Sequence, residues 1–233
     1  MNIFPYHIID LTHALDTKVP TWDGQCGFTT TVKSDYSAFA EDVKFKIQNI
    51  SMHAGIGTHI DSPAHCIPSG ITVEGLSLQH LIAPCVVINI SAQATSTYSL
   101  QPDDILKFEK EYEKIIEGAF VIVYTGWEQY WTVPPSYHNN YMFPSVSLEA
   151  AKLLLERNIV GLGIDTLSPD RPTDGFQVHQ LLLGNGKYII ENIANAQQLP
   201  AVGSLILALP IKAAGLTEAP IRLIGLVGYK NKN

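Results

Sequence analysis

The chain has 233 residues, of which 46% are hydrophobic, and its formal net charge at pH 7 is −7. This length can bury a large core, so we expect a single domain over residues 1–233. The acidic balance without a basic run argues against nucleic acid or an anionic membrane surface as a partner. No apolar run approaches the about 20 residues that span a bilayer.

Cysteine usage and the first residues of the chain favour a cytoplasmic setting. The three cysteines, Cys26, Cys66 and Cys85, are odd in number and lack the CxxC spacing of redox or zinc motifs. The opening stretch MNIFPYHIIDLTH has no basic segment followed by an apolar one, as a secretory signal would have. We therefore expect a reducing, cytoplasmic environment.

The first half of the chain predicts short strands joined by turn-rich loops. An apolar run at Ile8–Leu11 is followed by a loop that contains Trp22. Alternating apolar and polar residues predict half-buried strands at Phe28–Val32 and Val43–Ile50. A short helix is expected at Leu76–Leu81. The strand Cys85–Ile90 does not alternate, which indicates that both of its faces are covered.

The second half predicts helices that alternate with buried strands. Helices are expected at Gln101–Glu117 and at Leu148–Arg157, the second capped by Ser147 and stopped at Asn158. Tyr130–Tyr141 is aromatic and rich in proline, so it is expected to be a long loop that packs across a subunit interface or over a site. The expected strands are Ala119–Tyr124, Ile159–Ile164, Ser204–Leu209 and Arg222–Leu226. Together these elements predict an α/β protein, one mixed domain with a strand-rich core.

The stretch Met52–Cys66 carries the strongest functional signal. His53, His59, Asp61 and His65 all stand at odd positions, and in an extended chain such residues point to the same side. Three imidazoles and a carboxylate aimed at one point are typical of a zinc site or a related metal site. The alternative is a polar strand face whose histidines cap loops or bind water.

Two further regions hold candidate site residues. His179 and Glu191 are separated by 12 residues with glycines between them, so the chain can return both to one place. Their spacing alone is weak evidence, because such a pair occurs by chance in most proteins. Trp22 is a candidate substrate contact, with a lid over the core as the equally favoured alternative.

The sequence resembles the cyclase family of metal-dependent hydrolases, which includes bacterial kynurenine formamidase (arylformamidase) and isatin hydrolase. The resemblance rests on G-T-H-I-D-S-P-A-H at residues 57–65, which is similar to the family signature H-x-G-T-H-x-D-x-P-x-H. It extends along nearly the whole chain through I-D-L-T-H at 9–13, Y-T-G-W at 124–127, G-I-D-T at 163–166 and E-N-I-A-N at 191–195.

The resemblance implies the family's swivelling β/β/α fold, a homodimer or larger homo-oligomer, and one or two Zn²⁺ ions per subunit, with Mn²⁺ as the alternative. It implies that His59 and Asp61 bind one metal, that Asp61 bridges to a second, and that His179 and Glu191 complete the second site. It further implies that His65 transfers a proton and that Trp22 contacts the substrate.

One position departs from the family signature. The first histidine of the signature falls on Gly55 in this chain. His53 lies two residues earlier on the same face of an extended chain, so it can replace the missing ligand. The alternatives are a single-metal site or a weakened first site.

The ligand set predicts a hydrolase. A bound Zn²⁺ or Mn²⁺ lowers the pKa of its water from 15.7 toward about 7 and polarises a carbonyl. The expected reaction is hydrolysis of a small-molecule amide, as in the arylformamidase reaction that converts N-formylkynurenine to kynurenine and formate. The alternatives are hydrolysis of another cyclic amide or lactone, as in isatin hydrolase, a metal-binding protein without catalysis on the same scaffold, and a structural protein with a histidine-rich strand.

Overall fold

A sheet that closes on itself forms the centre of the molecule in the computed structural model, which describes residues 4–25 and 27–229. Seven strands follow one another in the order β12-β11-β5-β7-β9-β10-β4, and β4 pairs again with β12 to close the ring, while β1 lies outside on β12. The strands of this sheet are β1 (Tyr6–Asp10), β4 (His59–Asp61), β5 (Ile82–Asn89), β7 (Phe120–Tyr124), β9 (Gly161–Ile164), β10 (Tyr188–Glu191), β11 (Ser204–Pro210) and β12 (Glu218–Gly228). The expected mixed α/β class with a strand-rich core is confirmed.

Both faces of the parallel part of the sheet are covered. Strands β5, β7, β9 and β10 pair in parallel, and their apolar residues alternate between the inside of the ring and the helix-covered outside. Phe120 and Ile122 belong to the inner core, whereas Val121 and Val123 pack in the outer core. This arrangement explains why these segments read as unbroken apolar runs.

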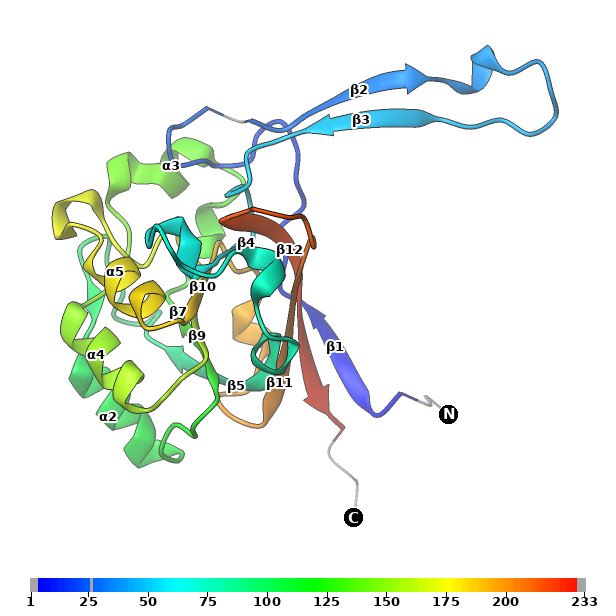
Figure 1. Cartoon of the computed structure of the whole chain (residues 1–233). Coiled ribbons are helices and arrows are strands. Elements are labelled where there is room, and N and C mark those ends of the chain that lie inside the picture. The colour runs from blue at the N-terminus through cyan, green and yellow to red at the C-terminus, as the bar shows by residue number, and fades with distance from the viewer. Residues whose placement is uncertain (1–3, 26, 230–233) are drawn as a thin grey trace.

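Helices cover the outer face of this sheet, on the left in Figure 1. They are α2 (Pro102–Glu111), α4 (Leu148–Glu156) and α5 (Gln177–Gly184), whereas α1 (Leu78–Leu81) contacts β5 and β11, and α3 (Pro134–His138) packs on the neighbouring 3₁₀ turns. The predicted cap of α4 is confirmed, since the Ala150 amide donates to Ser147 Oγ at 3.1 Å, and Asn158 follows the helix with a φ of 53°. Within the described residues, no helix combines the length and apolarity needed to cross a membrane.

Two helix predictions need correction. Helix α2 ends at Glu111 instead of Glu117, because the chain turns there to bury Ile115 in the outer core, and the Ile115 amide donates to Glu109 Oε1 at 3.2 Å. Helix α5 was not predicted. Its buried residues Val178 and Leu182 stand four positions apart, which is the helical spacing that would have revealed it.

The predicted long loop Tyr130–Tyr141 is wrong, because it consists largely of helical turns. It contains α3 and the 3₁₀ turn Asn139–Tyr141. Its centre is fixed to the same chain, where Tyr137 is fully buried and its carbonyl accepts a hydrogen bond from Trp127 Nε1 at 2.8 Å. Tyr137 therefore serves internal packing, whereas the expectation that the segment contacts another subunit stays a prediction.

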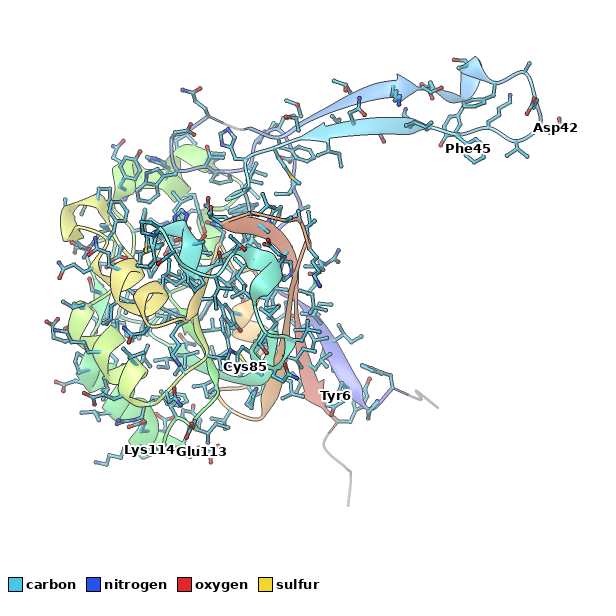
Figure 2. All side chains as sticks on the ribbon, viewed as in Figure 1. Tyr6, Asp42, Phe45, Cys85, Glu113 and Lys114 are labelled. Carbon is cyan, nitrogen blue, oxygen red and sulfur yellow. The ribbon has the colours of Figure 1, made fainter. Side chains whose placement is uncertain are left out.

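The strands near the N-terminus are more exposed than predicted. β2 (Thr29–Ser34) and β3 (Ile47–Ser51) pair only with each other, and they form a hairpin that projects from the body, with Asp42 and Phe45 near its tip (Figures 1 and 2). All residues of β3 are exposed, so the expected half-buried strand is wrong within this chain. The alternation is present, but no other element of the described chain covers its apolar face.

Two short strands lie outside the closed sheet. Strands β6 (Ser99–Leu100) and β8 (Ser145–Val146) pair in parallel beside the outer helices. Cys66 and Cys85 are free thiols, and Cys26 lies outside the described residues.

Candidate metal centre

Three neighbouring elements bring four ligand-type side chains together on the outer face of the sheet. His59 and Asp61 come from β4, Glu191 from β10 and His179 from α5. Strand β10 pairs antiparallel with β4, and Glu191 lies directly opposite His59. Directly opposite residues project to the same face, so the sheet itself places both carboxylates beside the imidazole.

Each carboxylate of this cluster faces both imidazoles. His59 Nε2 lies 3.4 Å from Asp61 Oδ1 and 3.4 Å from Glu191 Oε2. His179 Nε2 lies 3.6 Å from Asp61 Oδ2 and 3.4 Å from Glu191 Oε1. Asp61 is 1% exposed, yet neither of its oxygens has a hydrogen-bond partner within the described chain.

These distances fit a divalent cation. Nitrogen and oxygen ligands about 2.1 Å from a tetrahedrally coordinated ion lie about 3.4 Å from one another. A buried carboxylate without hydrogen bonds is costly unless a cation compensates it. Imidazole and carboxylate donors suit Zn²⁺ and Mn²⁺. The residues present therefore fit the metal that the sequence predicts.

Hydrogen bonds on the far side of each ring direct Nε2 toward the cluster. His59 Nδ1 lies 2.9 Å from the Gly57 carbonyl, and His179 Nδ1 lies 2.7 Å from Asp170 Oδ2. Asp170 also accepts hydrogen bonds from the amides of Val178, at 3.0 Å, and His179, at 2.9 Å. Such outer contacts fix the tautomer that leaves Nε2 free to bind a metal.

The charges of the cluster depend strongly on one another. Burial opposes a charge on His59, but Asp61 and Glu191 raise its pKa to about 10. Burial would raise the pKa of Asp61, yet the neighbouring imidazoles hold it well below its usual range. Burial and the nearby Asp61 raise the pKa of Glu191. Protons therefore occupy the cluster in the absence of a cation, and a metal ion must displace them.

His65 and Glu218 lie beside this cluster. His65 ends the 3₁₀ turn Pro63–His65, and its Nδ1 lies 3.4 Å from Glu218 Oε2. The hydrogen bond that His65 donates to the Glu218 carboxylate raises the pKa of His65 against the opposing effect of burial. Glu218, the first residue of β12, was missed in the sequence analysis, because it is far from the histidine stretch in the chain and belongs to no recognisable motif.

The structure does not bring His53 to the cluster. His53 is exposed, and its ring lies so close to Gly27 that a Cβ there would be 2.7 Å from it. Only His59–Asp61 is a strand within Met52–Cys66, and Gly57 adopts a φ of 61°. The two-residue spacing therefore points His59 and Asp61 to the same side of the strand. The extended conformation does not continue back to His53, so the spacing does not orient that side chain.

A cavity of about 440 Å³ opens over the cluster. Trp22, which is 36% exposed, forms one wall, and its ring centre lies 5.7 Å from that of Phe176 and 4.7 Å from that of Tyr141. The cavity thus combines a flat aromatic wall with a polar floor of His59, His179 and Glu191. The segment Tyr130–Tyr141 contributes Tyr141 behind that wall, next to Trp22.

Asp165, which belongs to the G-I-D-T stretch at 163–166, is not among the residues that line the cavity. It is fully buried and accepts a hydrogen bond from the Thr125 amide at 2.8 Å, and burial raises its pKa to about 6. Its contacts join the ends of β7 and β9, which is a structural role.

Comparison with known proteins identifies related chains. A family model described as "Putative cyclase" matches residues 9–171. An isatin hydrolase of Roseibium aggregatum is 31% identical over 73% of this chain and 71% of that protein. A kynurenine formamidase of Bacillus thuringiensis subsp. konkukian is 25% identical over 93% of this chain and 95% of that protein. The solved structure of isatin hydrolase A from Ralstonia solanacearum has a TM-score of 0.87 at 30% identity, covering 95% of this chain and 92% of that chain.

Proposed function

The chain belongs to the Cyclase family, and on that basis we propose that it is a metal-dependent hydrolase of an amide bond carried by an aromatic ring. The observation that carries the proposal is the buried cluster of His59, Asp61, His179 and Glu191 on the floor of an aromatic-walled cavity. A purely structural role gives no reason for the buried Asp61 carboxylate to lack hydrogen-bond partners beside a cavity, and the aromatic wall of that cavity favours catalysis over metal binding alone.

These four residues would hold Zn²⁺ or Mn²⁺. When bound, such an ion lowers the pKa of water toward neutrality and polarises a carbonyl. The contribution of the chain itself is to orient the imidazoles through Gly57 and Asp170 and to keep Asp61 ionised. The structure supports this assignment through the burial and the spacing of the ligand atoms.

His65 is the residue we assign to proton transfer. It lines the cavity beside the cluster, and its side chain is 34% exposed, so it can reach both substrate and solvent. Amide cleavage requires a proton on the departing nitrogen, and an imidazole is suited to deliver it. Glu218 would hold the His65 ring in place from the Nδ1 side.

Trp22 is the residue we assign to substrate binding. Its ring is partly exposed to the cavity and is braced by Phe176 and Tyr141, so a planar aromatic group can lie against it without rearrangement of the wall. This feature favours an aryl substrate over an aliphatic amide.

Two substrate classes satisfy this geometry. One is an open aryl formamide such as N-formylkynurenine, as the kynurenine formamidase relatives suggest. The other is a cyclic aryl amide such as isatin. The higher identity to isatin hydrolase, 31% against 25%, favours the cyclic amide.

We also propose that the protein is a homo-oligomer held together by the β2–β3 hairpin. Val43, Phe45, Ile47 and Ile50 are 45–63% exposed on this projecting element. Large apolar side chains gathered on one element are typical of an interaction surface. A second copy of the chain is the partner we expect.

A substrate panel tests the proposed function. Chelator-stripped protein is reloaded with Zn²⁺ or Mn²⁺ and mixed with isatin, an N-formylanilide and an aryl lactone, and the absorbance of each aromatic product is followed. We expect hydrolysis of at least one aryl amide only after metal is restored. Metal-loaded protein that hydrolyses none of these compounds would contradict the proposal.

A further inference from the structure

We propose that Glu218 is a metal ligand in this chain, and that its carboxylate occupies the space left open by the missing side chain at Gly55. The inference depends on the proposed function only in requiring that the cluster binds a divalent cation. It goes further by naming a ligand that the local sequence pattern does not contain.

The sheet register presents Glu218 to the cluster. Strand β4 is flanked by β10 on one side and by β12 on the other. Glu191 lies opposite His59, and Glu218 lies opposite Asp61. Because directly opposite residues share a face of the sheet, the two glutamates reach the face of His59 and Asp61 from opposite sides.

The carboxylate of Glu218 fills the position that a side chain at residue 55 would take. A Cβ built on Gly55 would overlap Glu218 Oε1, and it would lie 3.4 Å from His59 Nε2. Gly55 is absent from the glycines with positive φ, so its backbone accepts a side chain and only Glu218 stands in the way. A histidine stands at this position in the family signature, so the chain has exchanged an imidazole for a carboxylate from another strand.

The surroundings of Glu218 suit a cation. Asp61, His65 and Glu218 offer ligand atoms within 4.8 Å of one another. Glu218 Oε2 faces His65 at 3.4 Å, which leaves Oε1 on the side of Gly55 and His59. His53, the other candidate for the missing ligand, is exposed and packs against Gly27.

The exchange changes the charge of the site and its metal preference. With neutral imidazoles, the carboxylates of Asp61, Glu191 and Glu218 carry three negative charges, and a divalent cation leaves one of them uncompensated. Carboxylate oxygen favours Mn²⁺, whereas imidazole suits Zn²⁺. The ratio of Mn²⁺ affinity to Zn²⁺ affinity should therefore be higher in the wild-type site than in a site with histidine at residue 55.

Calorimetric titration of chelator-stripped protein with Mn²⁺ and with Zn²⁺ tests this inference. The variants are Glu218→Ala, the double variant Gly55→His with Glu218→Ala, and His53→Ala as the control. We expect Glu218→Ala to weaken Mn²⁺ binding at least tenfold or to lose an equivalent of metal. The double variant should recover Zn²⁺ binding and show a Zn²⁺-to-Mn²⁺ affinity ratio at least tenfold above wild type, and His53→Ala should match wild type.

Two results would overturn the inference. If Glu218→Ala binds both metals with the stoichiometry and affinity of wild type, Glu218 is not a ligand, although the proposed function stands. If His53→Ala loses metal and Glu218→Ala does not, His53 is the replacement. Wild-type protein that binds neither metal would instead refute the proposed function itself. Far-ultraviolet circular dichroism confirms folding, and Glu218→Gln, which keeps the side-chain shape, replaces the single variant Glu218→Ala if that variant fails to fold.

Discussion

Replacing Asp170 by asparagine separates the orientation of a ligand from the ligand itself. Asp170 accepts three hydrogen bonds, one from the Val178 amide to Oδ1, and two from His179, through its amide and Nδ1, to Oδ2. Asparagine offers only one oxygen. With that oxygen toward His179, its NH₂ group opposes the Val178 amide and leaves a buried donor unsatisfied, which costs about 1–3 kcal/mol.

The same substitution should weaken metal binding without removing a ligand. An amide oxygen is a poorer acceptor than a carboxylate for the His179 ring, and the loss of such an outer contact typically costs 10–100-fold in metal affinity. Urea unfolding in chelator measures the first effect, and titration with Zn²⁺ or Mn²⁺ measures the second. Asp174→Asn is the control, because Asp174 pairs with Arg171 at the surface and does not contact His179. Metal affinity within twofold of wild type in Asp170→Asn would refute the role of His179 as an oriented ligand.

Three further predictions concern other parts of the molecule. Trp22→Ala should raise KM for an aryl amide about tenfold and leave kcat nearly unchanged, because about 1.4 kcal/mol of stacking energy is lost. Trp22→Phe should retain most of the binding, and steady-state kinetics of both variants test this prediction. Burial lowers the pKa of His13 to about 4, so its neutral form stabilises the fold above pH 6.5 and that contribution, about 1–3 kcal/mol, is lost as the pH falls toward 4. His13→Phe, which keeps the stacking on Trp131, should show a smaller loss of stability than wild type between pH 7.5 and pH 5 in urea unfolding with chelator. Phe45→Asp should convert the oligomer to a monomer in light scattering, and a monomeric wild type would contradict the proposed interface.

Local patterns in the sequence predicted the parts of the site that lie on regular elements. His59 and Asp61 alternate on a true strand, so their shared direction follows from spacing alone. The buried strands β5 and β7 were predicted from apolar runs, and the N-cap residue Ser147 predicted the start of α4. These features depend on neighbours in the chain.

The parts that failed depend on contacts between distant segments. The alternation at Val43–Ile50 predicted a buried face, but burial requires a partner surface that the described chain does not supply. Glu218 reaches the cluster only because β12 returns beside β4. His53 was misplaced because the chain turns through Gly57 before the strand begins. No local spacing contains this information.

The proposed metal-dependent hydrolysis is tested by the rate of aryl amide hydrolysis as metal is added back to chelator-stripped protein, with Asp61→Asn measured in parallel. Asp61 touches both imidazoles of the cluster, and asparagine keeps its shape while removing its charge. Wild-type activity should rise with added Zn²⁺ or Mn²⁺ and saturate at a whole number of equivalents, whereas Asp61→Asn should bind metal weakly and stay nearly inactive. Full activity in stripped protein, or full activity and full metal occupancy in Asp61→Asn, would contradict this proposal.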